Sequence, residues 1–125
     1  MDASDSTERG RFLDKLKRSN EVEITVTGRK SKRKISTPVW FVLDGEKVIL
    51  LPIKGSESNW YKNLADDPQI GLKAEDKMMT FKARLVRDPE RVKTVVDKFR
   101  MKYPSGWERS QKYYTKRDAY AEVPI

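Results

Sequence analysis

Short apolar segments with a period of two, separated by turn residues, dominate the first half of this chain. Between residues 21 and 27, Val22, Ile24 and Val26 alternate with polar residues, which predicts a strand with one buried face. The polar segment Gly28–Lys32 then forms a turn. This pattern favours antiparallel strands joined by short turns.

Two more strands are expected directly after this turn. The first runs from about Lys34 to Leu43 and contains Pro38, which predicts an edge or a bulge because proline cannot donate to a ladder. Asp44-Gly45 is a tight-turn signal, and the apolar segment Lys47–Pro52 follows it. Because the apolar residues of that segment are consecutive, we expect it to be buried on both faces.

The rest of the chain adds helices and further strands. A frayed tail at residues 1–6 and a short helix over Thr7–Ser19 come first. After Pro52 the expected elements are a helix over Ser58–Ala65 capped by Ser58, strands over Gln69–Ala74 and Met78–Val86, a helix from Asp88-Pro89 to Pro104, a short helix near Gly106–Tyr114, and a strand over Asp118–Val123. This order predicts an α+β fold, a small and mainly antiparallel β-barrel with short peripheral helices. We expect one domain, with the tail and first helix at residues 1–19 and the barrel at residues 20–125.

Composition excludes several kinds of chemistry. The 125 residues include no cysteine and no histidine, so a disulfide framework, a thiolate nucleophile, a Cys/His zinc site and a Ser-His-Asp triad are all ruled out. Any metal would need oxygen ligands alone, and we predict no metal site. The net charge of +8 attracts nucleic acid, anionic lipid or a polyanionic small molecule, without choosing among them.

The length and apolar content also bear on location and assembly. The longest apolar run, Val48–Leu51 with Pro52 and Ile53, is far shorter than the roughly 20 residues of a membrane-spanning helix. The acidic N-terminus has no apolar segment typical of a signal peptide. We therefore expect a cytoplasmic protein, and a partner subunit could complete the core of so small a chain.

The segment Gly28–Lys34, called the basic turn below, carries five cations at Arg29, Lys30, Lys32, Arg33 and Lys34. Their mutual repulsion would be relieved by an anionic partner, although a solvated hairpin tip on a basic protein is an equally good interpretation. The chain has neither a Walker motif nor a dinucleotide-binding glycine fingerprint.

Two further segments are candidates for ligand binding. The loop Lys54-Gly55-Ser56 before a capped helix could offer backbone N–H groups and an ammonium to an anion, or it could be an ordinary connection. In the following helix, Trp60 and Leu64 share one face and are more often core residues than ligand contacts. Asn63, near the end of that helix, could cap its C-terminus or reach a ligand.

Tyrosines near the C-terminal end are the remaining candidates for proton donors. In a chain without histidine, the hydroxyls of Tyr103, Tyr113 and Tyr114 are weak candidates for a catalytic role, because a tyrosine pKa is about 10. The same aromatic segment could instead provide packing, a subunit contact or a lid over a flat ring.

Taken in order, these segments resemble the deazaflavin-dependent nitroreductase family, whose members are split β-barrel proteins related to the FMN-binding pyridoxamine-phosphate oxidases. The resemblance is carried by Thr27-Gly28-Arg29-Lys30-Ser31, Thr37-Pro38-Val39-Trp40-Phe41, Lys54-Gly55-Ser56, Trp60-Tyr61-Lys62-Asn63-Leu64 with Pro68, and Tyr103-Pro104-Ser105. It covers about residues 20–123, and the order and spacing of the segments carry it rather than any single motif.

The resemblance implies a homodimer that binds coenzyme F420 and passes a hydride from it to a quinone, a nitroaromatic or another unsaturated acceptor. Arg29, Lys30 and Lys54 would match the family's contacts to the cofactor phosphate and its acidic tail. Pro38 and Trp40 match positions that line the ring pocket, and Trp60 and Asn63 match the family's helix motif. Backbone N–H groups near Lys54 and Gly55 would face the carbonyls of the deazaflavin.

The sequence departs from the family pattern in places. Lys32 stands where the family often has glycine, and Ile35 stands where it often has arginine, a role that Arg33 or Lys34 could take over. Ile53 replaces a serine present in some members, and the loop before Trp60 is shorter than in the nitroreductase itself.

Two alternative functions remain open on the sequence. The first keeps the fold and replaces F420 by FMN as the cofactor. The second is a non-enzymatic barrel that binds nucleic acid through the basic turn and the interleaved aromatic residues, and we regard this partner as the less favoured one.

Overall fold

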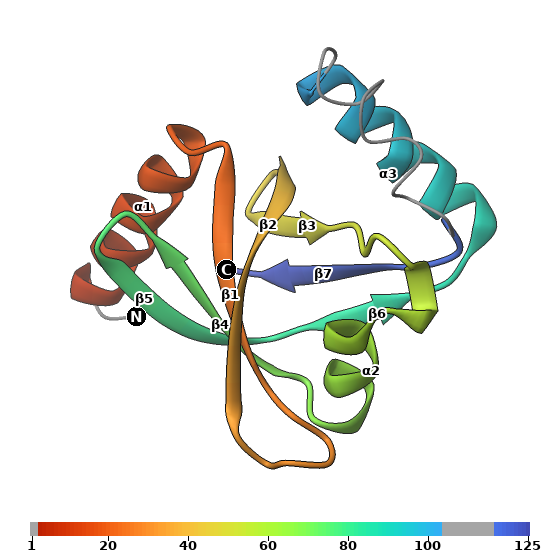
Figure 1. Cartoon of the computed structure of the whole chain (residues 1–125). Helices are drawn as coiled ribbons and strands as arrows, with labels where there is room; N and C mark the ends of the chain where they lie inside the picture. The colour runs from red at the N-terminus through yellow and green to blue at the C-terminus, as the bar shows by residue number, and fades with distance from the viewer. Residues whose placement is uncertain (1–2, 104–116) are drawn as a thin grey trace.

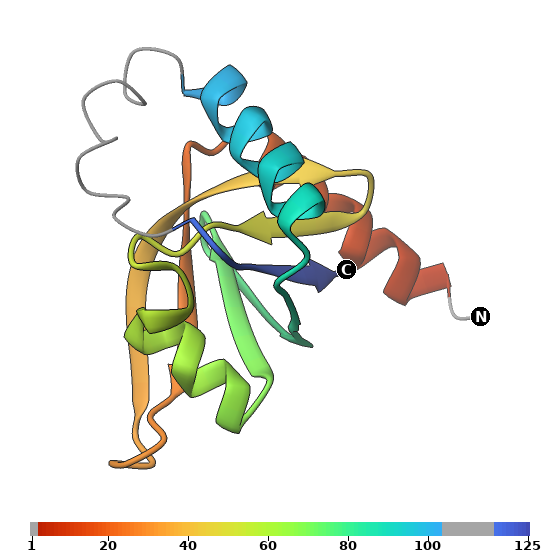
Figure 2. The same ribbon diagram turned by 90° about the vertical axis from the view of Figure 1, so that its right-hand side faces the viewer.

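The computed structural model describes residues 3–103 and 117–125, and Figure 1 shows the arrangement of their helices and strands. The helices are α1 (Ala3–Lys17), α2 (Asn59–Asp66) and α3 (Pro89–Lys102), with a 3-10 turn η1 (Gly55–Glu57) before α2. The strands are β1 (Glu21–Thr27), β2 (Lys34–Asp44), β3 (Lys47–Leu50), β4 (Gln69–Ala74), β5 (Lys77–Lys82), β6 (Arg84–Val86) and β7 (Tyr120–Pro124). Figures 1 and 2 show a curled sheet with the helices around it, which is the expected α+β architecture.

The strands form one seven-stranded sheet in the order β5-β4-β1-β2-β3-β7-β6, and its pairings are antiparallel. The first hairpin pairs Glu21 with Trp40 at one end and Thr27 with Lys34 at the other. Pro38 lies opposite Glu23, while the pairing of β2 with β3 begins only at Phe41. Pro38 is therefore at a local edge, as the sequence predicts.

A break at Ala83 closes the sheet into a half-barrel. The sequence predicts one strand over Met78–Val86, but the structure divides it into β5 and β6, which lie at opposite ends of the strand order. The N–H of Ala83 donates to the carbonyl of Pro68 at 2.9 Å and to no neighbouring strand. The chain thus bends at this residue and passes from one edge of the sheet to the other.

Strand β3 contributes to two separate cores. Val48 and Leu50 are completely buried in the barrel interior. Ile49 and Leu51 point the other way and pack in a second cluster with Val92, Val95, Val96 and Phe99 of α3. The prediction that this strand is buried on both faces is confirmed, because α3 covers its outer face.

Helix α1 begins earlier than expected. The sequence predicts a frayed tail at residues 1–6, whereas the helix starts at Ala3. Further along α1, Phe12 and Leu16 are completely buried in the barrel core, and the ring of Phe12 lies 5.9 Å from that of Phe81.

The two helices with predicted capping residues form close to where the sequence places them. Ser58 and Asp88 occupy the N-cap positions of α2 and α3, but neither side chain bonds to its helix. The prediction for Ser58 is therefore correct for its N-cap position and wrong for its side-chain bond. The Ser58 Oγ instead accepts from the N–H of Lys54 at 2.9 Å.

The C-terminal part of the chain is described only from Arg117 onwards. Its strand runs over Tyr120–Pro124 rather than 118–123. The helix expected near residues 106–114 lies outside the described residues. Across the described ranges, no helix is long and apolar enough to cross a membrane.

Candidate functional site

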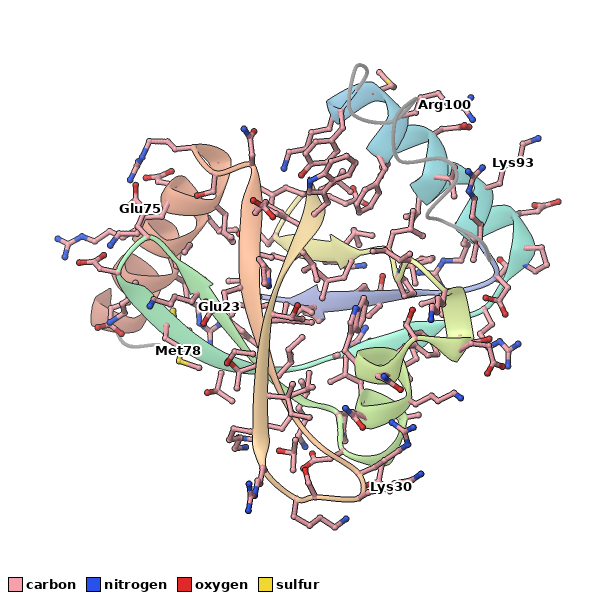
Figure 3. All side chains as sticks on the ribbon, viewed as in Figure 1. Glu23, Lys30, Glu75, Met78, Lys93 and Arg100 are labelled. Atoms are coloured by element: carbon pink, nitrogen blue, oxygen red, sulfur yellow. The ribbon has the colours of Figure 1, made fainter. Side chains whose placement is uncertain are left out.

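A pocket of about 700 Å³ lies between the basic turn, the first half of β2, the loop after β3 and helix α2. In Figures 1 and 2 the turn that joins β1 to β2 lies next to α2, and Figure 3 labels Lys30 on this turn. Three cations line the pocket, namely Arg29, Lys30 and Lys54. Its apolar wall comes from Val26, Ile35, Pro38, Val39, Ile53 and Trp60.

The basic turn has a compact backbone that depends on Gly28. The N–H of Gly28 donates to the carbonyl of Arg33 at 2.8 Å, and the N–H of Lys32 donates to the carbonyl of Gly28 at 2.9 Å. A Cβ at residue 28 would lie 2.6 Å from Ser31 Oγ, so a larger residue would force the Ser31 side chain to move. Lys32 has a φ of +60°, a backbone conformation that glycine adopts more easily than any other residue.

Asn63 joins the basic turn to α2. Its Oδ1 accepts from the backbone N–H of Arg29 at 3.1 Å and from the Arg29 guanidinium at 2.8 Å. The same guanidinium donates to the carbonyl of Asn59 at 3.4 Å. A second link is the ion pair of Lys32 with Asp66, at 3.6 Å. Asn63 is only 4% exposed. Its side-chain carbonyl is therefore held inside the protein, where it positions the basic turn.

The residues between β3 and α2, 51–58, are called the pocket loop below. Gly55 has a φ of +56°, and its N–H donates to the carbonyl of Pro52 at 3.1 Å. The N–H of Lys54 donates to Ser58 Oγ. The two N–H groups that the resemblance assigns to the ring carbonyls therefore have acceptors within the loop.

The structure brings together six of the ten predicted cofactor-binding residues. Arg29, Lys30, Pro38, Lys54, Trp60 and Asn63 line the pocket. The other four, Arg33, Lys34, Trp40 and Gly55, are not among its described lining residues. Lys34 instead donates to Thr27 Oγ1 at 3.0 Å.

Trp40 lies beside Tyr103. Their rings are stacked, with centroids 4.2 Å apart and planes 7° apart. The Tyr103 hydroxyl accepts from the N–H of Phe41 at 3.2 Å and lies 2.7 Å from the carbonyl of Asn20. Tyr103 is 9% exposed and packs in the second core, which is a structural role. Tyr113 and Tyr114 lie outside the described residues.

Sequence reasoning did not select Ile35 and Ile53 as site residues. They are 45% and 48% exposed, and both line the pocket. For Ile35 a signal was available in the alternation of β2. In the structure, the register pairs Ile35 with Val26, which also lines the pocket. Ile53 lies in an irregular loop, where no periodic pattern of apolar residues predicts the direction of its side chain.

A family model described as F420H(2)-dependent quinone reductase matches residues 3–120. The chain belongs to this family. The resemblance stated from the sequence is thereby confirmed. This member of the F420H2-dependent quinone reductase family is an F420-dependent reductase, and coenzyme F420 is its cofactor.

Solved structures with the same fold are also known. The chain is similar to an F420-H2-dependent reductase, with 25% identity, a TM-score of 0.63, and coverage of 83% of this chain and 93% of the other. A protein described as an F420 reductase is 15% identical over 83% of this chain and 84% of its own, with a TM-score of 0.61. A protein described as a domain-swapped dimer is 20% identical, covers 97% and 99%, and has a TM-score of 0.63. These likenesses confirm the split-barrel fold.

The residues of the pocket fit the chemistry of this cofactor. Coenzyme F420 combines a flat ring with a phosphate and an acidic tail. The pocket combines an apolar wall with three cations, and no carboxylate is among its described lining residues. Its volume is in the range of about 300–1,000 Å³ that is typical of small-molecule sites.

Proposed function

We propose that this pocket holds coenzyme F420 and an apolar acceptor together. The observation that carries this proposal is the presence of Arg29, Lys30 and Lys54 in the same pocket as an apolar wall. The three cations would hold the phosphate and the acidic tail, and Pro38 and Trp60 would face the ring. When bound, F420 supplies the hydride, so the protein needs no histidine or cysteine of its own.

The residues of the chain would contribute binding, orientation and exclusion of water. Asn63 holds Arg29 against α2, so the Arg29 guanidinium has a defined position before the ligand binds. Such preorganisation lowers the entropic cost of binding. The apolar wall keeps water from the ring face, which strengthens the electrostatic contacts of the cations.

The exposed isoleucines favour an apolar acceptor such as a quinone. Ile35 and Ile53 are two of the four large hydrophobic residues that are exposed in the described part of the chain. They come from different segments and line the same pocket. An apolar acceptor that covered them would remove this surface from water, which is favourable at about 25 cal/mol per Å². A strongly charged acceptor would gain nothing there.

Titration of the purified protein with F420 and with FMN, side by side, tests the cofactor assignment. We expect tight binding of F420 and much weaker binding of FMN, followed by fluorescence and by absorbance. A single-stranded oligonucleotide serves as a third ligand, since a nucleic-acid-binding barrel would bind it with steep salt dependence. Tight binding of FMN or of the oligonucleotide without binding of F420 would contradict the proposal.

We also propose that two copies associate. Glu23, Lys73 and Met78 lie in register across β1, β4 and β5, and all three are exposed; Figure 3 labels Glu23 and Met78. Met78 is 51% exposed there, which suits a contact with a second copy. Sedimentation of the wild type and of Met78→Lys tests this, with a dimer expected only for the wild type.

A cytoplasmic location is a further proposal from the sequence. Cell fractionation with an antibody to the native protein tests it. We expect the protein in the soluble fraction, and recovery only in the membrane fraction would contradict the proposal.

A further inference from the structure

Asp118 lies outside the pocket, yet its carboxylate bonds to the pocket loop. Its Oδ1 accepts from the backbone N–H of Ser56 at 2.9 Å, and its Oδ2 accepts from the Ser56 hydroxyl at 2.6 Å. The two residues are 62 positions apart in the sequence. Because both oxygens bond to one residue, they define its orientation as well as its position.

These two bonds differ from the other backbone bonds of the pocket loop. The N–H groups of Gly55, Glu57 and Ser58 donate to carbonyls within the loop, at 3.0–3.1 Å. Such bonds shape the loop internally. The bonds of Ser56 instead reach the segment that leads into β7, so they tie the loop to the sheet.

Arg87 and α2 complete this junction. The guanidinium of Arg87 donates to Asp118 Oδ2 at 3.3 Å. Burial raises the pKa of Tyr61 in α2, while Arg87 lowers that pKa and Asp118 raises it. The side chain of Asp118 is only 27% exposed, so its interactions are less screened by solvent than those of a surface pair.

The loop that Asp118 holds is the loop that lines the pocket. Ile53, Lys54 and Ser58 line the pocket on either side of Ser56, and Ser56 itself does not. A displacement of Ser56 would therefore move Lys54, two residues away, relative to Arg29 and Lys30, the other two cations of the pocket.

We propose that Asp118 is a positioning residue for cofactor binding, which acts through Ser56 on Lys54. This inference rests on the proposed function, since it takes the pocket to be the F420 site. Asp118 touches neither the cofactor nor the acceptor. It fixes the position of Lys54, the cation that would contact the cofactor.

The test compares F420 affinity in Asp118→Ala, Ser56→Ala and the double variant, by fluorescence titration. We expect Asp118→Ala to weaken F420 binding about tenfold, which corresponds to about 1.4 kcal/mol, because Lys54 would lose its fixed position relative to the other pocket cations. In the Asp118→Ala background, the Ser56→Ala change should add little. Unchanged binding in Asp118→Ala, or fully additive losses, would overturn the inference.

Control variants separate the loop contact from general effects. Asp97→Ala removes a carboxylate of α3 that is paired with Arg100 at 4.0 Å and does not line the pocket, so it should leave F420 binding unchanged. Asp118→Asn is the variant of choice if Asp118→Ala does not fold, since it keeps one acceptor and should bind F420 with intermediate affinity. Wild-type affinity in Asp118→Asn would count against the inference.

Failure of the inference and failure of the proposed function give different results. If the wild type does not bind F420, the proposed site is wrong. If the wild type binds F420 and Lys54→Ala weakens it, but Asp118→Ala binds normally, only the role of Asp118 is wrong.

Discussion

The Oδ1 atom of Asn63 accepts two hydrogen bonds from Arg29, one from its backbone N–H at 3.1 Å and one from its guanidinium at 2.8 Å. A single buried amide thereby fixes both the start of the basic turn and the direction of its first cation. Asn63 lies on the pocket wall, but its carbonyl is already used within the protein.

Replacement of Asn63 by leucine should weaken both folding and cofactor binding. It would leave the N–H of Arg29 without this acceptor, which costs about 1–3 kcal/mol for a buried group. Urea unfolding measures the stability, and fluorescence titration measures F420 affinity. Asn63→Asp keeps the acceptor and should restore stability, but its negative charge on the pocket wall should still weaken binding of the anionic cofactor. Equal affinities in the wild type and Asn63→Leu would contradict this role.

Replacement of Lys30 and Lys54 by alanine should separate binding from stability. Both side chains are exposed pocket cations, and exposed charges contribute at most about 1 kcal/mol to folding. We expect F420 affinity to fall strongly while the melting temperature stays nearly constant. Lys93→Ala, at an exposed position of α3 outside the pocket, is the matched control and should keep normal affinity.

Ile53→Ser should change the choice of acceptor without changing the cofactor. The 48% exposed Ile53 would lose its apolar surface, so the KM for an apolar quinone should rise severalfold while the Kd for F420 stays constant. Steady-state kinetics with an apolar quinone and a polar one measures the difference. A parallel change for both quinones would count against selection by this side chain.

Tyr103→Phe should reduce stability but not the rate of hydride transfer. It keeps the stacked ring against Trp40 and removes the hydroxyl that accepts from the N–H of Phe41. We expect a loss of about 1–3 kcal/mol in unfolding free energy and an unchanged kcat. A large fall in kcat at full occupancy with F420 would restore Tyr103 as a catalytic candidate.

Lys102 should make stability depend on pH in the alkaline range. Its ammonium donates to the carbonyl of Phe41 at 2.7 Å and lies 3.6 Å from the centre of the Phe41 ring. Burial lowers its pKa from 10.5 to about 8. Above the lower pKa the unfolded chain keeps a proton that the folded chain has lost, so stability rises with pH up to the ordinary pKa.

Comparison with Lys102→Met isolates this effect from other titrating groups. The unfolding free energy of the wild type minus that of Lys102→Met should increase between about pH 8 and pH 10. Lys102→Arg, which stays charged, should show no such increase relative to Lys102→Met. A constant difference across this range would show that Lys102 titrates normally.

Local signals predicted most of the strands and helices correctly. The hairpin at Asp44-Gly45 and the helix after Asp88-Pro89 follow from turn and helix-start chemistry within a few residues. The division at Ala83 could not be found in this way. Its N–H pairs with Pro68, and that contact exists only once the barrel has closed.

The sequence by itself determined the fold class, the family and the gathering of positive charge at the basic turn, because alternation, turn residues and motif order are properties of neighbouring residues. Only the tertiary structure decided which cations share a pocket with Lys54, and that Arg33 and Lys34 are not among its lining residues. It also decided that Asp118 holds Ser56. The physical reason is that the direction of a side chain depends on strand register and on contacts between distant segments.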